Sequence, residues 1–243
     1  MILELDIGNT RCKWRLVDAV GVVLAESGCA TAELASALRA LPMRADVLRV
    51  RAACVRGETI EHVVRRAVRD EIGVEVEFAR TQRSAAGVRN SYAEPERLGV
   101  DRWLAMLAGF VASGGAVCVF DCGSAITADL VDDDGLHRGG YIVPGIAMSR
   151  AGLFAATDRV RFDADQVMPG MVPGTSTAEA VVHGTLLAAV GMLRVAREQF
   201  ERICPRAPVL LTGGDAPALL PWLGFPAILR THLVLDGLRL VLP

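Results

Sequence analysis

The sequence contains one short pattern twice, and this repeat limits the possible folds more than any other feature. Near the start, the strand-like run ILEL at residues 2–5 leads into DIGNT at 6–10. In the middle of the chain, the apolar run at 117–120 leads into DCGS at 121–124. Each turn is followed by a second strand-like run, an acidic turn with glycine and a third run. Small residues after a strand let backbone N–H groups approach phosphate oxygens, and the Asp can hold a cation. The repeat therefore predicts two lobes, each with one phosphate-facing hairpin.

The segments between and after the hairpins predict an α/β fold. Apolar residues recur at helical spacing in 32–41 and 58–72, whereas 48–53 and 74–78 have the pattern of short strands. We also expect helices at 146–156 and from a capping box at 176–179 to about residue 200. Residues 232–242 fit a helix or a strand. We predict an N-terminal lobe at 1–114 and a C-terminal lobe at 115–243, with the boundary in the small residues Ser113-Gly114-Gly115.

Composition excludes several classes of protein. The chain has 243 residues, of which 52% are hydrophobic and 22% are charged, as in an ordinary soluble globular protein. A net charge of -2 gives no electrostatic reason to expect nucleic acid or an anionic membrane as a partner. We expect no transmembrane helix, because no run of about 20 uncharged apolar residues occurs. The first residues have the pattern of a strand and lack that of a signal peptide, so we predict a cytoplasmic protein.

Two further loops combine glycine with hydroxyl or acidic residues, at 99–102 and 212–215. Any one of the four loops is equally well explained as a tight turn in which an Asp side chain bonds the backbone. Together they favour nucleotide binding. The sequence has no GxxxxGK[ST] motif and no GxGxxG motif after a strand, so we expect a nucleotide fold outside those two classes.

The motifs resemble those of known ATP-binding proteins. DIGNT, DCGSAIT at 121–127 and LTGGD at 211–215 resemble the two phosphate motifs and the adenosine motif of the actin, hexokinase and Hsp70 superfamily. More narrowly, NSYAEPERLGVDRW at 90–103, GGYIVPG at 139–145 and STAEAVVHG at 176–184 resemble type III pantothenate kinases, over essentially the whole chain. The resemblance implies a two-lobed, actin-like (ribonuclease H-like) α/β fold with duplicated lobes and ATP in the cleft between them. It also implies ATP-dependent phosphorylation of pantothenate to 4'-phosphopantothenate, the first step of coenzyme A biosynthesis.

The resemblance also assigns an ATP site. Asp6 would lie near Mg²⁺, directly or through water, and Asp121 would bind a monovalent cation, K⁺ or NH₄⁺. Ser124 stands where family members usually have Thr and would contact ATP through its hydroxyl. Gly213 and Gly214 would lie against the adenine or the ribose. The first phosphate loop would comprise Asp6, Ile7, Gly8, Asn9, Thr10, Arg11, Cys12 and Lys13.

An acceptor site follows from the same resemblance. Its residues would be Tyr92, Gly99, Val100, Asp101 and Arg102, with Thr177 contributed by the other subunit of a homodimer. An alcohol acceptor needs one carboxylate to orient it and take its proton, and Asp101 is the candidate general base.

Each of these acceptor residues also has a structural explanation. Asp101 could instead be an ordinary helix N-cap, and Tyr92 a packed aromatic residue. Arg102 could contact the substrate, support Asp101 or form a surface salt bridge.

Other functions remain open at this stage. The chain could be another small-molecule kinase or an ATPase of the same superfamily. It could also be a regulatory accessory factor, because relatives of the family have been described as such. Intact Asp6, Asp101 and Asp121 argue against a degenerate enzyme. A filament-forming role is disfavoured, since 243 residues leave little room for additional subdomains.

Overall fold

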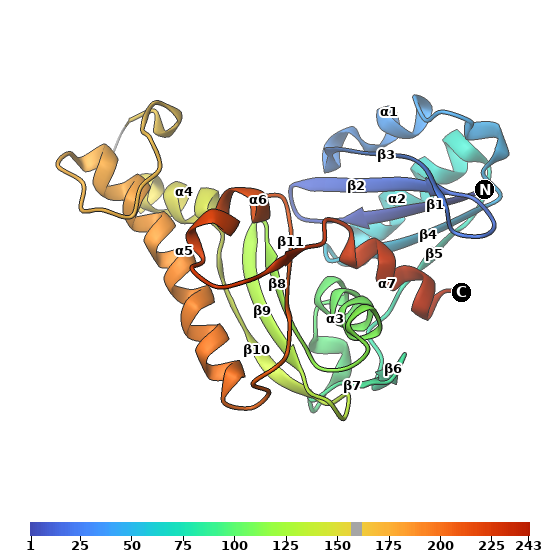
Figure 1. Ribbon diagram of the computed structural model, residues 1–243. Coiled ribbons are helices and arrows are strands. Elements are labelled where there is room, and N and C mark those ends of the chain that lie inside the picture. The colour runs from blue at the N-terminus through green and yellow to red at the C-terminus, as the bar shows by residue number, and fades with distance from the viewer. Residues whose placement is uncertain (157–161) are drawn as a thin grey trace. The chain divides into compact units, whose positions relative to one another are not determined.

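The computed structural model describes residues 1–156 and 162–243, and these residues form two units (Figure 1). The first unit comprises residues 1–112 and 232–243, and the second unit comprises residues 113–231. The lobe bounds 1–114 and 115–243 stay a prediction. The units show, however, that the end of the chain packs with its beginning.

The first unit is built on a five-stranded sheet with the order β3-β2-β1-β4-β5. The first three strands are antiparallel neighbours, whereas β4 and β5 run parallel to β1. The predicted run of strand, turn, strand, turn and strand at the start of the chain is therefore confirmed. The strands are β1 (Ile2–Ile7), β2 (Arg11–Val17), β3 (Val23–Ala30), β4 (Arg49–Cys54) and β5 (Val76–Phe78).

Helices α1 (Leu34–Arg39) and α2 (Glu58–Ile72) pack on one face of this sheet. Their apolar faces meet the alternate β1 residues Leu3, Leu5 and Ile7, which are fully buried. Helix α2 has the bounds that its apolar spacing predicts, and Gly73 in the left-handed conformation ends it. The core of the first unit therefore lies between these helices and the sheet.

Helices α3 (Val100–Ser113) and α7 (Leu233–Val241) also belong to the first unit, where α7 packs on β1 and β4. The structure thus decides for a helix at the end of the chain. Glu4 is completely buried and pairs with both Arg15 and Arg51, and Arg15 Nη1 reaches Asp236 Oδ1 on α7 at 2.6 Å. This buried network of ion pairs connects α7, the last helix, to β1, the first strand. Two small strands, β6 (Ser84–Ala85) and β7 (Val88–Arg89), form a separate hairpin.

The second unit repeats the strand order of the first. Its sheet has the order β10-β9-β8-β11-β12. Strands β10, β9 and β8 are again antiparallel neighbours, and β11 and β12 run parallel to β8. The duplicated hairpin read from the sequence therefore corresponds to a duplicated sheet topology. The strands are β8 (Val117–Cys122), β9 (Ala125–Val131), β10 (His137–Pro144), β11 (Val209–Thr212) and β12 (Ile228–Leu229).

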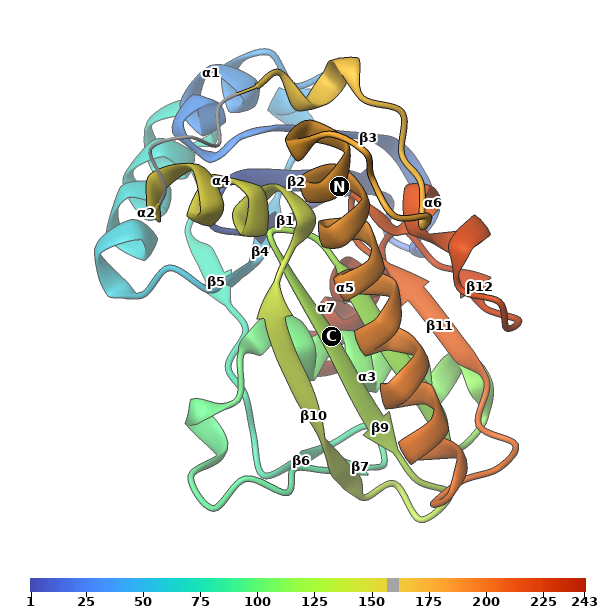
Figure 2. The ribbon, with the colours of Figure 1, turned by 90° about the vertical axis from the view of Figure 1, so that its left-hand side faces the viewer.

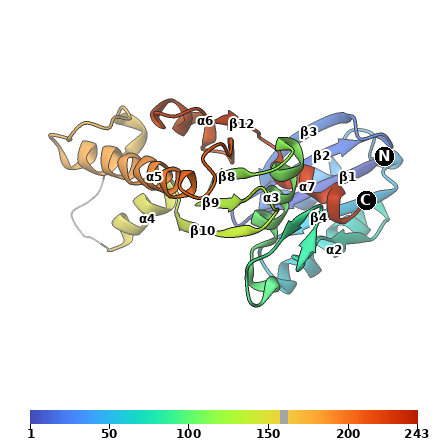
Figure 3. The ribbon, with the colours of Figure 1, turned by 60° about the horizontal axis from the view of Figure 1, so that its bottom comes forward.

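Helix α5 (Thr177–Glu201) runs along the second sheet, with α4 (Ile146–Ala156) beside it and α6 (Ala216–Leu219) near β8 (Figures 2 and 3). Ser176 caps α5 as predicted, since its Oγ accepts a hydrogen bond from Glu179 N–H at 3.2 Å. By length and composition α5 could span a membrane, but core helices of soluble proteins pass the same test. Its buried residues Leu186, Val190 and Leu193 belong to the core of the second unit.

Candidate active site

The first phosphate loop is a tight turn at the end of β1. Gly8 N–H donates to Arg11 O at 3.0 Å, which closes the turn, and Asn9 and Thr10 are exposed at its tip. The strand register places Asp6 directly opposite Lys13. Directly opposite residues of an antiparallel pair share one face, so the carboxylate and the ammonium group flank the same side of the turn. An anionic ligand with a bound cation can use both charges.

Cys12 lies on the other face of this hairpin. It is fully buried opposite Ile7, and burial strongly raises the pKa of its thiol. The side chain of Cys12 is therefore part of the core of the first unit, and only its backbone belongs to the turn region.

Asp121 occupies the corresponding place in the second unit. It lies next to last in β8, opposite Thr127 of β9 and Thr212 of β11. The following Cys122 is fully buried, and burial raises the pKa of its thiol, so it is a core residue. Ser124 is exposed at the turn, and Gly123 N–H donates to Ala125 O at 3.0 Å. The hairpin thus presents the carboxylate of Asp121 just before the buried Cys122 and the hydroxyl group of Ser124 two residues after it.

Two other segments converge on this turn. Gly213 has a φ of +96°, and a Cβ there would lie 2.5 Å from Asp121 Oδ1 and closer still to Cys122 O. Asp215 N–H donates to Cys122 O at 2.8 Å, and Gly145 N–H donates to Ser124 O at 2.9 Å. Residues 121–124, 145 and 213–215 therefore form one compact group, which we call the loop cluster. The sequence predicted Ser124, Gly213 and Gly214 as ATP contacts but assigned no role to Gly145 or Asp215.

The acceptor residues gather at the start of α3 in the first unit. Arg102 is 6% exposed, and its Nη1 donates to the Tyr92 hydroxyl at 3.1 Å. Asp101 is the second residue of α3, and its Oδ1 accepts a hydrogen bond from Arg102 N–H at 2.7 Å. A Cβ at Gly99 would lie 2.6 Å from Asp101 Oδ1, so glycine leaves the space that this carboxylate occupies.

These contacts decide between some of the structural alternatives. Asp101 lies inside the helix rather than at an N-cap, because the first helical residue is Val100 and Trp103 N–H donates to Gly99 O at 3.0 Å. Arg102 is buried, which excludes an ordinary surface salt bridge.

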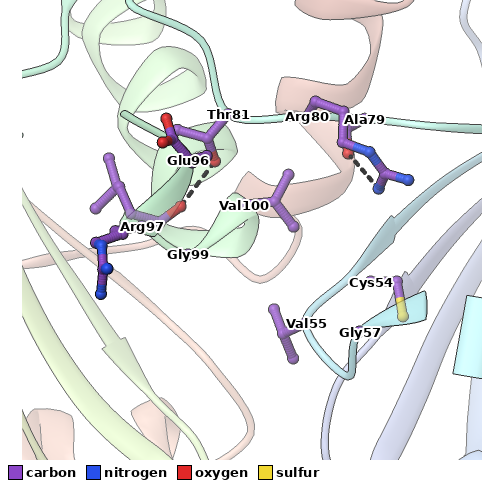
Figure 4. A pocket seen from close by; sticks show the side chains of 11 residues that line it. Cys54, Val55, Gly57, Ala79, Arg80, Thr81, Glu96, Arg97, Gly99 and Val100 are labelled. Carbon is purple, nitrogen blue, oxygen red and sulfur yellow. Dashed lines mark hydrogen bonds between the residues drawn. The ribbon is translucent and has the colours of Figure 1, made fainter. Parts of the chain in front are cut away.

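A cavity of about 270 Å³ adjoins this segment (Figure 4). It lies within the first unit and is lined by Gly99 and Val100, by residues 79–81 and by the turn before α2 with Val55 and Gly57. Arg80 at its rim is held by two hydrogen bonds to the buried Glu61, at 2.5 and 2.6 Å. Sequence reasoning missed this cavity, because its walls come from segments with no shared motif.

Thr177 belongs to the second unit. It is exposed at the first position of α5, next to the cap residue Ser176. Nearby, the Glu179 carboxylate accepts hydrogen bonds from Thr175 N–H and Oγ1, and these bonds lower the pKa of Glu179. Thr177 is therefore held on an ordered helix start.

Within the described residues, no group of three or more His, Cys, Asp or Glu side chains could hold a metal by itself. Mg²⁺ in kinases takes one or two carboxylates and completes its shell with substrate phosphates and water. The single carboxylates Asp6 and Asp121, each beside an exposed turn, fit that kind of site.

The two sheets of equal topology, each with an Asp at the same turn, define an α/β fold of the actin-like class. Solved structures support this fold. A "conserved putative Baf family transcriptional activator" from Campylobacter jejuni has a TM-score of 0.60 at 21% identity, covering 98% of this chain and 95% of that one. A "putative N-acetylmannosamine kinase" from Listeria monocytogenes has a TM-score of 0.53 at 14% identity, covering 99% and 98%.

Sequence relatives narrow the class. The type III pantothenate kinase family model matches residues 2–199. The type III pantothenate kinase of Pseudomonas aeruginosa strain LESB58 is 39% identical over 100% of this chain and 99% of its own length. The chain belongs to the type III pantothenate kinase family.

Proposed function

We propose that this chain transfers the γ-phosphoryl group of ATP to the primary hydroxyl of pantothenate, with Asp101 as the general base. The family supports the reaction itself, which begins coenzyme A biosynthesis. The placement of Asp101 supports its role: the carboxylate lies in the first turn of α3, in the space that Gly99 leaves free and beside the Tyr92–Arg102 pair.

In this reaction the protein mainly positions the donor and the acceptor and neutralises negative charge. Phosphoryl transfer has a loose transition state, in which the acceptor hydroxyl loses its proton late. A carboxylate within hydrogen-bond reach orients that hydroxyl and takes the proton. Asp101 would do this, while Tyr92 and Arg102 hold polar atoms of pantothenate. The neighbouring cavity supports an acceptor of small-molecule size at this place.

We infer that ATP contacts the first phosphate loop, Ser124, Gly213 and Gly214. A kinase of this family uses ATP with a divalent metal. Asp6 would hold Mg²⁺, directly or through water, and the ion neutralises charge on the transferring phosphoryl group. Lys13, opposite Asp6 in the register, would pair with phosphate oxygens. The exposed backbone at Asn9 and Thr10 supports close approach of the phosphates.

Asp121 would hold a monovalent cation. Its neighbours across the sheet, Thr127 and Thr212, add oxygen atoms on the same face of the second sheet, which suits a hard cation. Turnover should therefore be faster in potassium or ammonium buffer than in sodium buffer. Equal rates in all three would remove Asp121 from this role.

A homodimer completes the proposal, with Thr177 contacting the pantothenate of the other subunit. Helix α4 has no buried residue, although it is largely apolar, and the outer face of α5 exposes Leu187 and Val195. Apolar faces of this kind mark protein contacts, which supports dimerisation through the second unit.

We propose a cytoplasmic location, as expected for an enzyme of coenzyme A biosynthesis. The net charge of -2 supports neither nucleic acid nor membrane as a partner.

Release of ADP with pantothenate, compared with a panel of sugars and hydroxy acids, tests the proposed function. We expect that, of the acceptors compared, only pantothenate stimulates the release of ADP. Stimulation by another acceptor only would point to a different small-molecule kinase, and no acceptor-dependent release would favour a regulatory accessory role.

A further inference from the structure

The carboxylate of Asp215 stands out in the loop cluster. It is half-buried, and no hydrogen bond or ion pair reaches it from the described residues of the chain. Burial raises the pKa of Asp215, and Arg150 only partly offsets this effect. Partial desolvation of a carboxylate that receives no protein hydrogen bond costs folding free energy, and a perturbed group of this kind beside a binding loop is a candidate for contact with a ligand.

The backbone of Asp215 is fixed on both sides. Its N–H donates to Cys122 O at 2.8 Å, and its C=O accepts a hydrogen bond from Leu219 N–H at 3.0 Å. The side chain caps no helix end, although Asp215 precedes α6. These hydrogen bonds fix the backbone of Asp215, and its carboxylate makes no hydrogen bond with the described residues.

We propose that Asp215 accepts hydrogen bonds from the ribose hydroxyls of ATP and so selects ribonucleotides. This inference rests on the proposed function, in which Gly213 and Gly214 lie against the nucleoside. Asp215 follows them directly, on the segment that packs against Cys122.

The chemistry favours the ribose over the other parts of the nucleotide. Phosphate oxygens are negative and would repel the carboxylate. The adjacent 2'- and 3'-hydroxyls offer two donors, and a carboxylate has two acceptor oxygens. Acidic side chains recognise ribose hydroxyls in the same way in dinucleotide-binding folds. The exocyclic amino group of adenine and a metal-bound water are the other donors within the nucleotide complex. The experiment separates them from the ribose, because 2'-deoxy-ATP differs from ATP in the ribose only.

The test compares Asp215→Ala with Asp134→Ala, using ATP and 2'-deoxy-ATP. Asp134 is an exposed carboxylate in the acidic turn of the second unit, and it has no proposed role in binding or catalysis. Its removal therefore makes the same change in net charge away from the proposed nucleotide site. We expect the wild type and Asp134→Ala to prefer ATP by about tenfold in kcat/KM, as the loss of one hydrogen bond to a charged group predicts. In Asp215→Ala the preference should fall to about one, mainly through a higher KM for ATP, with the KM for pantothenate unchanged.

Three outcomes would overturn the inference. In the first, Asp215→Ala lowers kcat/KM equally for ATP and 2'-deoxy-ATP, so that the preference for ATP remains. In the second, Asp215→Ala raises the Mg²⁺ concentration needed for a half-maximal rate, which would assign Asp215 to metal-bound water. The wild type could also fail to discriminate between the nucleotides. If pantothenate is not phosphorylated at all, the proposed function fails instead. Direct titration with ADP and 2'-deoxy-ADP then still tests Asp215, because binding needs no acceptor. Thermal melting of both variants checks that they fold.

Discussion

Gly213 and Gly214 are neighbours in one motif, yet their surroundings differ. Gly213 has a left-handed φ, and its Cα faces Asp121 Oδ1 and Cys122 O, whereas a Cβ at Gly214 would meet nothing within 4 Å. We expect Gly213→Ala to displace the Asp121 turn and to lower kcat/KM at least tenfold, through both backbone strain and steric overlap. Gly191→Ala in helix α5 is the control, since a Cβ there also meets nothing within 4 Å and Gly191 has no proposed role in binding; it should stay within about threefold, as measured by ADP release.

A second prediction at this scale concerns Asp101. Replacement of Asp101 by Asn keeps the size of the side chain but removes the base, so kcat should fall by about 10²–10⁴. ATP binding and the melting temperature should remain as in the wild type, because the amide oxygen can still accept the hydrogen bond from Arg102 N–H. Near-normal turnover in Asp101→Asn would refute the general-base role.

Asp215 also predicts an unusual dependence of stability on pH. Because its pKa is raised in the folded state, ionisation of this group opposes folding above the ordinary Asp range near 3.9. That cost is present at neutral pH and disappears as the pH falls below this range. Asp215→Asn should therefore melt at a higher temperature than the wild type at pH 7, and the difference should shrink toward pH 4. A lower melting temperature of Asp215→Asn at pH 7 would show instead that the carboxylate stabilises the fold. The control is Asp134→Asn, whose side chain is exposed and whose replacement should change the melting temperature little.

At the scale of elements, the last helix depends on the first strand. Glu4 on β1 is buried against Arg15 and Arg51, and Arg51 Nη1 also donates to Leu242 O at 2.6 Å at the end of α7. A one-residue change in β1 therefore affects an element from the other end of the chain.

We expect Glu4→Ala to destabilise the protein by about 3–5 kcal/mol, because it leaves Arg51 buried without its carboxylate and leaves Arg15 with Asp236 alone. Urea unfolding measures this change. The control is Asp70→Ala, which breaks the exposed pair of Arg66 and Asp70 on α2 and should cost less than about 0.5 kcal/mol. A similar small cost for Glu4→Ala would mean that water or a rearranged α7 replaces the lost partner.

At the scale of the whole molecule, dimerisation is the prediction that matters most for activity. Leu187→Glu places a charge on the exposed apolar face of α5 and should convert a dimer to a monomer in sedimentation velocity. The monomer should bind pantothenate poorly, since Thr177 of the other subunit is missing. Val63→Glu, on the exposed face of α2 in the first unit, makes the same substitution elsewhere and should leave the dimer intact. A monomeric variant with the normal KM for pantothenate would contradict a role for Thr177 across the interface.

Local patterns in the sequence determined the elements and the class of chemistry. The bounds of α2, the capping of α5 by Ser176 and both hairpins follow from apolar spacing and turn residues close together in the chain. The motifs at 6–10, 121–127 and 90–103 were enough to indicate a kinase of this family, because their chemistry is carried by short segments.

Only the tertiary structure decided which distant segments meet. Residues 232–242 fitted a helix or a strand until packing on β1 and β4 favoured the helix. The hydrogen bond from Arg102 to Tyr92, the contact of Gly145 with Ser124 and the placement of Asp215 beside Cys122 join residues with no common local pattern. Burial and hydrogen bonding depend on such long-range contacts, so it could be recognised only in the folded chain that the carboxylate of Asp215 is half-buried and receives no hydrogen bond from the described residues.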